Sequence, residues 1–257
     1  MKRVLIALAV LLALLITPVV VMFAMVFGAV APLEADLDLP NGARLVKDGY
    51  VNIGVLPAGD GAVALIDAGN DATGAALLAE LKRKNLETSA VKAIFFTHGH
   101  PDHIAASHLF KDAQVLVLPG DVALAQGSGR SKGPLPSRFD IPPEKLAKVT
   151  RPLADGETVD IGPLAVKVYA VPGHTAGSAA YLSGGVLYLG DSASASKEGT
   201  VIGAPWVFTD DQAENRASVV ALAKRLKAEG AVVTKVVFSH SAPLDGDAAL
   251  MAYDGSR

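Results

Sequence analysis

Residues 95–103 have the sequence FFTHGHPDH and hold the densest group of potential metal ligands in the chain. Four of these residues have side chains that bind metals: His98, His100, Asp102 and His103. The apolar run Val91–Phe96 leads into them and is typical of a buried strand. A helical pattern, Ile104–Phe110, follows, and Pro101 suits the first turn of a helix. We therefore expect the four side chains at the carboxyl end of a strand, where open α/β sheets usually bind their ligands.

Three further potential ligands follow apolar runs later in the chain. His174 lies in the sequence VPGHTAGS, Asp191 follows LYLG, and His240 follows VVFS. Each is weak evidence alone, because an aspartate at a strand end is more often a turn residue and a histidine there is more often a surface or capping residue. Their weight increases in combination with the cluster at residues 98–103.

The complete pattern H-x-H-x-D-H at residues 98–103 resembles the metallo-β-lactamase fold superfamily of hydrolases. The histidine of P-G-H-T, the aspartate of G-D and a late histidine occur in the order that this superfamily shows. The resemblance extends from about Gly42 to Pro243. Two departures concern geometry: the late motif is SHSA, residues 239–242, in place of G-H-G, and residues 104–107 lack the glycines that many members carry.

The resemblance implies a site for two divalent metal ions. The first ion would be bound by His98, His100 and His174, the second by Asp102, His103 and His240, with Asp191 as a bridge. These nitrogen and oxygen donors suit zinc, and iron or manganese accept the same set. Asp67 resembles a position that accepts the second N–H of a ligand histidine from outside the metal's own shell, and an ordinary turn aspartate is the alternative.

The periodicity of the remaining sequence indicates a mixed α/β domain. We expect strands at residues 43–47, 50–55, 62–67, 91–96, 114–118, 158–161, 165–170, 179–182, 186–189 and 232–238, and helices at 72–84 and 211–229. The resemblance implies more, an αββα sandwich of two mixed β-sheets flanked by helices. Residues 127–143, rich in Gly, Ser and Pro, either border a substrate cleft or form a mobile surface connection. Trp206 is expected in the core.

Composition excludes several classes of chemistry. The chain has 257 residues, a formal net charge of -3 and no cysteine. It therefore has no disulfide, thiolate ligand or cysteine nucleophile, and no charge excess that favours nucleic acid as a partner. The length suggests one or two domains with ample core.

The amino terminus predicts a membrane anchor. Val4–Leu33 is free of charged residues and long enough to span a bilayer with some tilt. Basic residues precede it and acidic residues follow, so we expect a single-pass protein with its catalytic part on the periplasmic or extracellular side. The predicted organisation is an anchor at 1–33, a linker at 34–41 and a catalytic domain at 42–257. A cleaved secretory signal ending at Ala31 is the alternative.

The predicted function is metal-dependent hydrolysis of a small molecule through an ester, thioester, lactone or lactam bond. Two cations would lower the pKa of a bridging water, and Asp102 would orient the hydroxide and move a proton to the leaving group. A mononuclear iron oxidoreductase resembling persulfide dioxygenases is the alternative of the same fold. A third possibility is a membrane-tethered binding module without catalysis. The sequence leaves the oligomeric state open.

Overall fold

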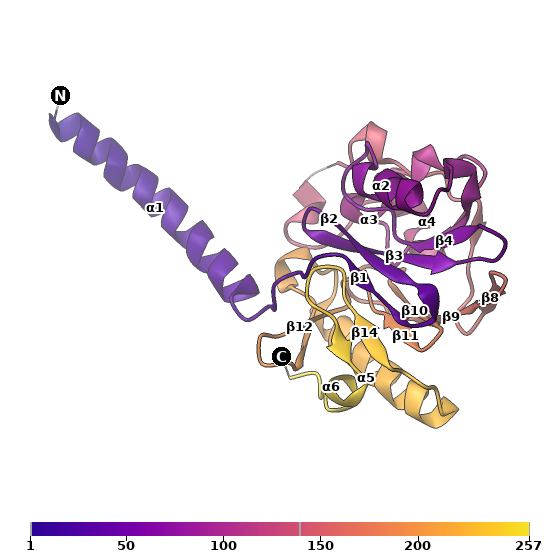
Figure 1. Ribbon diagram of the computed structural model, residues 1–257. Helices are drawn as coiled ribbons and strands as arrows, with labels where there is room; N and C mark the ends of the chain where they lie inside the picture. Colours follow the sequence, from indigo (N-terminus) through magenta and orange to yellow (C-terminus); the bar gives the residue numbers. More distant parts are fainter. Residues whose placement is uncertain (1, 139, 257) are drawn as a thin grey trace.

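Two mixed β-sheets lie face to face in the computed structural model, which describes residues 2–138 and 140–256 (Figure 1). The first sheet has the strand order β1 (Leu37–Asp38), β2 (Arg44–Asp48), β3 (Val51–Pro57), β4 (Val63–Ile66), β5 (Val91–Phe95), β6 (Gln114–Val117) and β7 (Arg151–Pro152). The second has the order β15 (Leu244–Asp245), β14 (Lys235–Val237), β11 (Val186–Tyr188), β10 (Ala179–Ser183), β9 (Ala165–Ala170) and β8 (Thr158–Asp160). In the first sheet β4 to β7 are parallel neighbours, and in the second only β11 and β14 are.

Helices cover the outer faces of both sheets, as the αββα prediction requires. The helices are α1 (Lys2–Phe27), α2 (Ala75–Arg83), α3 (Pro101–Ile104), α4 (Pro119–Ala125), α5 (Gln212–Glu229) and α6 (Ala248–Met251). Figure 1 shows α2, α3 and α4 over the first sheet, and α5 and α6 beneath the second. A separate pair of short strands, β12 (Ala193–Ala195) and β13 (Val201–Gly203), lies in the chain between β11 and β14 of the second sheet.

Three apolar layers hold this arrangement together: one between the two sheets, one between the first sheet and its helices, and one between the second sheet and α5. On β5, Phe95 faces the second sheet, where its ring meets the edge of Tyr181 at 5.5 Å between centroids. Its neighbours Ile94 and Phe96 face the opposite way, toward the helices over the first sheet. This alternation is the period of two that a strand imposes on its side chains. Because β5 is buried on both faces, its carboxyl end delivers residue 97 and its successors to the interior edge between the sheets.

Several expected elements differ from the structure. The helix expected at Ile104–Phe110 is wrong: α3 ends at Ile104, and a 3₁₀ turn occupies Ser107–Leu109. The backbone N–H groups of Ala105 and Ala106 donate to the carbonyls of residues 69 and 68, so they cannot continue a helical ladder. The expected strands, in contrast, are all present, and each of their ends lies within three residues of the expected position. Trp206 is 53% exposed, so its expected place in the core is wrong.

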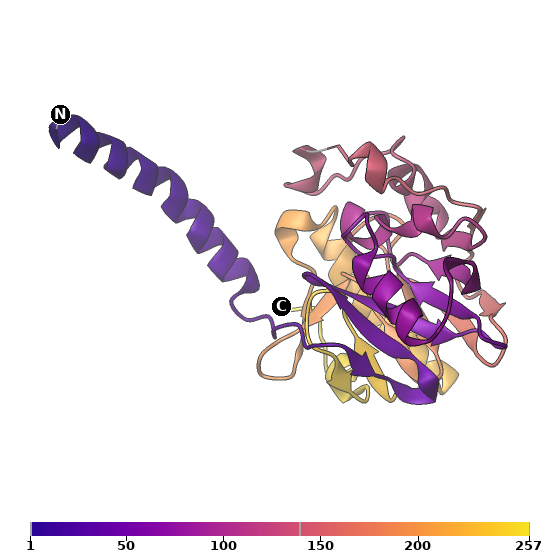
Figure 2. The ribbon, with the colours of Figure 1, turned by 45° about the horizontal axis from the view of Figure 1, so that its top comes forward.

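The amino-terminal helix α1 projects away from the sandwich in both ribbon views (Figures 1 and 2). Over the described residues, no helix combines the length and the apolarity that crossing a bilayer takes. The side chains of residues 1–11, 13, 15 and 19, which belong to the predicted anchor, lie outside the described part. Most of the apolar side chains that are described on α1 are exposed, among them Leu14 at 67% and Met25 at 80%, whereas Phe27 at its end is partly buried.

The segment after α1 is bonded to the edge of the small β12–β13 pair. Val30 forms an isolated antiparallel bridge with Ser196, and the Ala31 N–H donates to the Ala195 carbonyl at 2.9 Å. The Lys197 N–H donates to the carbonyl of residue 29 at 2.8 Å. Within the expected linker, β1 pairs with β2, so part of residues 34–41 belongs to the first sheet.

Candidate metal centre

Asp67 organises the loop that follows β5. It lies at the end of β4, the parallel neighbour of β5, with a left-handed φ of 64°. Its carboxylate accepts hydrogen bonds from the Thr97 N–H at 2.7 Å and the Thr97 hydroxyl at 2.8 Å. It also lies 2.8 Å from His103 Nδ1, which leaves Nε2 as the free nitrogen of that ring. Asp67 therefore fixes both the start of the motif loop and the orientation of His103.

Three histidines from two sheets form a first group of ligand atoms. His98 and His100 come from the loop after β5, and His174 comes from the turn between β9 and β10. The distances are 3.0 Å from His98 Nε2 to His100 Nδ1, 3.1 Å from His100 Nδ1 to His174 Nε2, and 3.3 Å from His174 Nε2 to His98 Nε2. All three side chains are buried.

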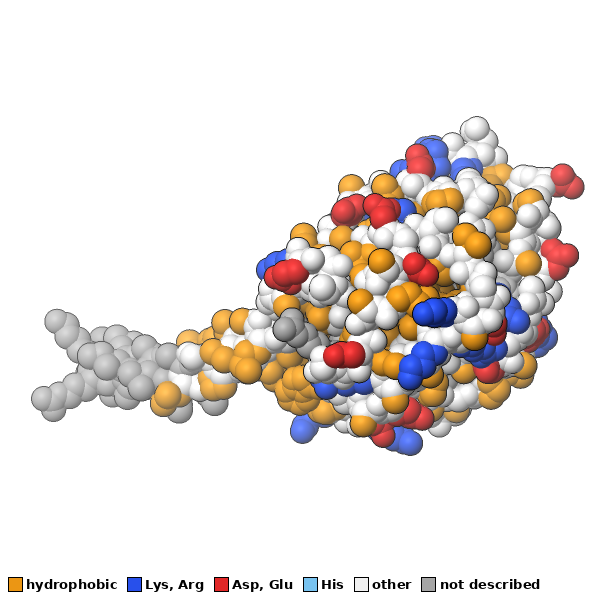
Figure 3. Space-filling model, turned by 90° about the horizontal axis from the view of Figure 1, so that it is seen from below, with side chains coloured by type: hydrophobic (Ala, Val, Ile, Leu, Met, Phe, Trp, Pro, Cys, Tyr) orange, Lys and Arg blue, Asp and Glu red, His pale blue; other side chains and the backbone are white. Residues whose placement is uncertain are grey.

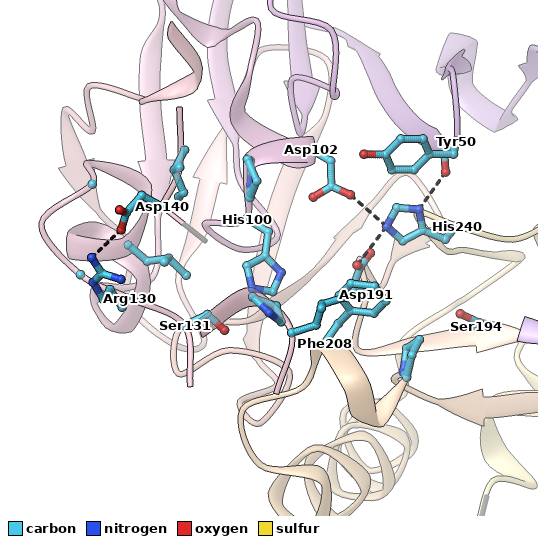
Figure 4. A pocket seen from close by; sticks show the side chains of 18 of the residues that line it. Tyr50, His100, Asp102, Arg130, Ser131, Asp140, Asp191, Ser194, Phe208 and His240 are labelled. Atoms are coloured by element: carbon cyan, nitrogen blue, oxygen red, sulfur yellow. Dashed lines mark hydrogen bonds and ion pairs between the residues drawn. The ribbon is translucent and has the colours of Figure 1, made fainter. Parts of the chain in front are cut away.

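A second group lies beside the first and shares Asp191 with it. His240 Nε2 is 3.0 Å from Asp191 Oδ2 and 3.4 Å from Asp102 Oδ2, as Figure 4 shows. His103 Nε2 is 3.4 Å from Asp191 Oδ1. On the other side, Asp191 Oδ2 is 3.7 Å from His174 Nε2. The Asp191 carboxylate therefore lies between the two groups, and the seven side chains named from the sequence converge on one place.

This donor set fits metal ions. Zinc–nitrogen bonds of roughly 2.0–2.1 Å in tetrahedral geometry place neighbouring ligand atoms about 3.3–3.4 Å apart, close to the spacings of the three-histidine group. His103 Nε2 and Asp191 Oδ1 are buried 3.4 Å from each other, and neither has a hydrogen-bond partner among the described residues. Buried polar atoms without partners are costly, and a shared cation would satisfy both.

Charge separates the two groups. Burial lowers the pKa of His98 far below its ordinary value and that of His174 to about 3, so both are neutral, the form that binds metals. Burial also disfavours the charged form of His240, but the carboxylates of Asp191 and Asp102 raise its pKa to about 10. Protons and metal ions therefore compete for His240, and metal binding must release a proton there.

The backbone holds His240 despite the unusual SHSA motif. His240 Nδ1 lies 2.8 Å from the Tyr50 carbonyl, and the two rings stack with centroids 5.8 Å apart. This contact turns Nε2 toward Asp191. Tyr50, which lies in the turn between β2 and β3, is a site residue that the sequence did not indicate, because its hydrogen bond to His240 comes from its backbone carbonyl group.

Asp121, on α4, is a second residue that sequence reasoning missed. Its buried carboxylate accepts hydrogen bonds from the Gly99 N–H, the Gly177 N–H and the Thr175 hydroxyl, each at 2.7 Å. It therefore joins the loop of His98 and His100 to the turn of His174. A Cβ on Gly177 would lie 2.4 Å from the Asp121 backbone nitrogen, so this close approach requires glycine. No motif marks Asp121, since its partners are mainly backbone groups.

A cavity of about 1030 Å³ opens onto the centre, with His100, Asp102, Asp191 and His240 in its wall. Residues from the long segment 127–143 line another side, which favours the cleft interpretation of that segment over a plain surface connection. Figure 2 shows this segment, between α4 and β7, at the upper edge of the domain. The site thus combines a polar, ligand-rich floor with access for a small molecule.

Comparisons with known proteins identify the same family as the sequence motifs do. A family model described as the metallo-beta-lactamase superfamily matches residues 46–240. An uncharacterised protein of Mycobacterium tuberculosis is 31% identical over 125 residues, 46% of this chain and 53% of that protein. A hydroxyacylglutathione hydrolase of Erythrobacter litoralis is 32% identical over 133 residues, 51% of this chain and 45% of the relative. The chain thus spans about half the length of these curated relatives.

Among solved structures, the metallo-beta-lactamase MIM-1 from Novosphingobium pentaromativorans is 21% identical, with a TM-score of 0.63 over 88% of this chain and 87% of that one. At this identity the likeness concerns the fold alone. The family model, in contrast, spans more than half of the chain and both ends of the ligand set. The chain therefore belongs to the metallo-beta-lactamase superfamily.

Proposed function

We propose that the chain is a metal-dependent hydrolase that binds two divalent cations, and that both cations are zinc. The observation that carries this proposal is the position of Asp191, whose two oxygens face ligand nitrogens of both groups. His98, His100 and His174 would hold one ion, and Asp102, His103 and His240 the other. When bound, such ions lower the pKa of a water toward neutrality and polarise the bond to be cut.

Asp102 is the residue placed to move the proton. Its side chain lines the cavity, with Oδ2 3.4 Å from His240 Nε2 and Oδ1 3.8 Å from His103 Nε2. Burial opposes its charge, but His103 and His240 lower its pKa well below the ordinary value. The ionised carboxylate can accept a proton from the attacking water and pass it to the leaving group.

The bond cleaved is proposed to be a carbonyl bond, in an ester, thioester, lactone or lactam. Similarity to hydroxyacylglutathione hydrolases of Erythrobacter litoralis and Vibrio cholerae favours the thioester. A phosphodiester of nucleic acid is disfavoured by the formal net charge of -3.

The test combines metal content with turnover. The full chain, purified in detergent and loaded with zinc, should contain two ions by mass spectrometry and hydrolyse acyl thioesters. Asp102→Asn should lower kcat about 10²–10⁴-fold, the usual contribution of general acid–base catalysis. His108→Ala is the matched control, because His108 is exposed, does not line the cavity, and its Nδ1 lies 3.0 Å from the Ala105 carbonyl. Full activity in Asp102→Asn, or one iron per chain in protein analysed as purified, before any zinc is added, would contradict the proposal.

The chain is further proposed to be anchored in a membrane by α1, with the catalytic domain outside the cytoplasm. Support comes from the uncharged stretch Val4–Leu33, from the basic residues before it and from the exposed apolar side chains of α1. Extraction of membranes with alkaline carbonate should leave the protein in the pellet, and added protease should reach the domain only from the non-cytoplasmic side. Release by carbonate would refute the anchor.

A further inference from the structure

The end of α1 and the segment after it form one wall of the catalytic cavity. Four apolar residues make this N-terminal wall: Phe23, Phe27, Val30 and Leu33. They lie outside residues 46–240, the part that the superfamily model matches. The Phe27 ring contacts the ring of Phe208 from the domain, with centroids 6.2 Å apart, and stacks on the ring of Phe23, with centroids 5.7 Å apart.

This wall is held in place by the backbone. The bridge between Val30 and Ser196 and the bonds of residues 29 and 31 to the β12–β13 pair fix the chain directly after α1. The Lys197 ammonium adds a bond of 2.7 Å to the Gly28 carbonyl at the end of the helix. Ala31 packs against the apolar layer under the second sheet. The N-terminal wall is therefore part of the folded domain's surface.

The cavity that the wall closes is apolar away from the metal ligands. Leu124, Leu135, Ile141 and Phe208 contribute from the domain side. Among the described residues that line it, the basic side chain is Arg130, whose Nη2 lies 2.5 Å from Asp140 Oδ1. Besides the metal centre and its histidines, the described lining therefore offers a peptide-like thiol only this arginine, whose charge is already paired with a carboxylate. A volume of about 1030 Å³ lies at the upper end of the usual range for ligand pockets, about 300–1,000 Å³.

We infer that the N-terminal wall binds a linear acyl chain, and that the substrate is an amphiphilic acyl ester or thioester. The inference rests on the proposed hydrolase function for its scissile bond. The carbonyl would lie at Asp102 and Asp191, and the acyl chain would extend along the apolar surface that Phe27 and Phe208 form together. Figure 3 shows apolar side chains along α1 where it meets the domain, so the apolar surface of the helix continues to the wall.

Acyl-chain length is the quantity to measure. Each methylene moved from water into an apolar pocket contributes about 0.8 kcal/mol, or about a fourfold change in kcat/KM. The zinc-loaded full chain in lipid nanodiscs should hydrolyse p-nitrophenyl decanoate with a much higher kcat/KM than the butanoate. In Phe27→Ser the decanoate-to-butanoate ratio should fall at least tenfold, and Phe27→Leu should restore most of it.

Met25→Ser is the matched control, because Met25 lies on the same helix, is 80% exposed and does not line the cavity. It should keep the wild-type ratio. A wild-type ratio near one, or an unchanged ratio in Phe27→Ser, would overturn the inference.

A second readout separates this inference from the proposed function. Calorimetric titration with decanoate and butanoate requires no turnover, and background partitioning into the nanodisc is the same for all variants. We expect tighter decanoate binding by the wild type and by Met25→Ser than by Phe27→Ser. Chains that bind decanoate in this order but hydrolyse neither ester would refute the hydrolase and retain the acyl site. Equal decanoate binding by all three would refute the acyl site, whatever the activity.

Discussion

Replacing Asp121 by asparagine tests whether one buried carboxylate holds the two histidine-bearing loops together. The carboxylate accepts three hydrogen bonds, from Gly99, Thr175 and Gly177. An asparagine of the same shape keeps one acceptor oxygen, so its NH₂ group must face at least one N–H donor. The Gly177 N–H donates to Oδ1, whereas the other two donors share Oδ2. An NH₂ group at the Oδ1 position therefore leaves only the Gly177 N–H unpaired, which is the smallest disturbance.

The magnitude follows from these contacts. An unpaired buried donor costs about 1–3 kcal/mol, and the remaining bonds lose the gain from the acceptor's charge. We expect a loss of about 2–3 kcal/mol in the free energy of unfolding, which lowers Tm by roughly 4–12 °C for a domain of this size. Metal affinity should fall about 10–100-fold, the usual effect of losing a group that orients ligands.

The assay compares Asp121→Asn with Asp112→Asn, a substitution at an exposed aspartate. Differential scanning calorimetry of the zinc-loaded chain gives Tm, and competition with a chromophoric chelator gives the zinc Kd. The control should match the wild type in both. If Asp121→Asn bound zinc with wild-type affinity, the loops would be held by other contacts and the reasoning would be wrong.

Three further predictions concern the surroundings of the centre. Asp67→Ala frees the ring of His103 and should weaken zinc binding about 10–100-fold, measured by the same chelator competition. The metal-free chain should lose stability as pH rises from about 6.5 to about 10, because the pKa of His240 is raised to about 10 in the folded state. The protonated ring stabilises the fold fully only below the pKa of about 6.5 that histidine has in the unfolded chain. Calorimetry with and without zinc should show this fall in Tm with rising pH in the metal-free form. Tyr181→Phe removes a buried hydroxyl that donates to the Phe96 carbonyl at 2.6 Å and should cost about 1–3 kcal/mol in chemical denaturation, with wild-type zinc stoichiometry.

The sequence predicted which potential ligand side chains come together, because the residue types that bind metals can be recognised locally. Each metal-type residue follows an apolar strand, and strand ends in a layered α/β domain meet at one edge. In agreement with this rule, ligand-type atoms of His98, His174 and Asp191 lie 3.3–4.0 Å from one another. Asp67 lies against His103, as its strand-end position and the superfamily resemblance led us to expect.

Other features depend on contacts that no local pattern encodes. The helix expected after residue 103 ends early because distant carbonyls capture its N–H groups. The strands β12 and β13 are three residues each and β12 consists of Ala and Ser, so they lack the apolar alternation that marks a strand. Asp121 acts through glycine and threonine neighbours, and Trp206 is exposed in a 3₁₀ turn after Pro205. Such features follow from the tertiary arrangement.

The seven proposed ligands are divided between the halves of the sandwich, four from the segment after β5 and three from the ends of strands of the second sheet. Neither half alone can assemble the pair of ion sites, so an ion that binds here fastens the two sheets to each other across their common core. The free energy of metal binding then adds to the free energy of folding, because both are gained when the two sheets come together. A truncated chain that ends before residue 174 should not bind the metal ions. During synthesis, metal uptake should begin when the second sheet packs against the first.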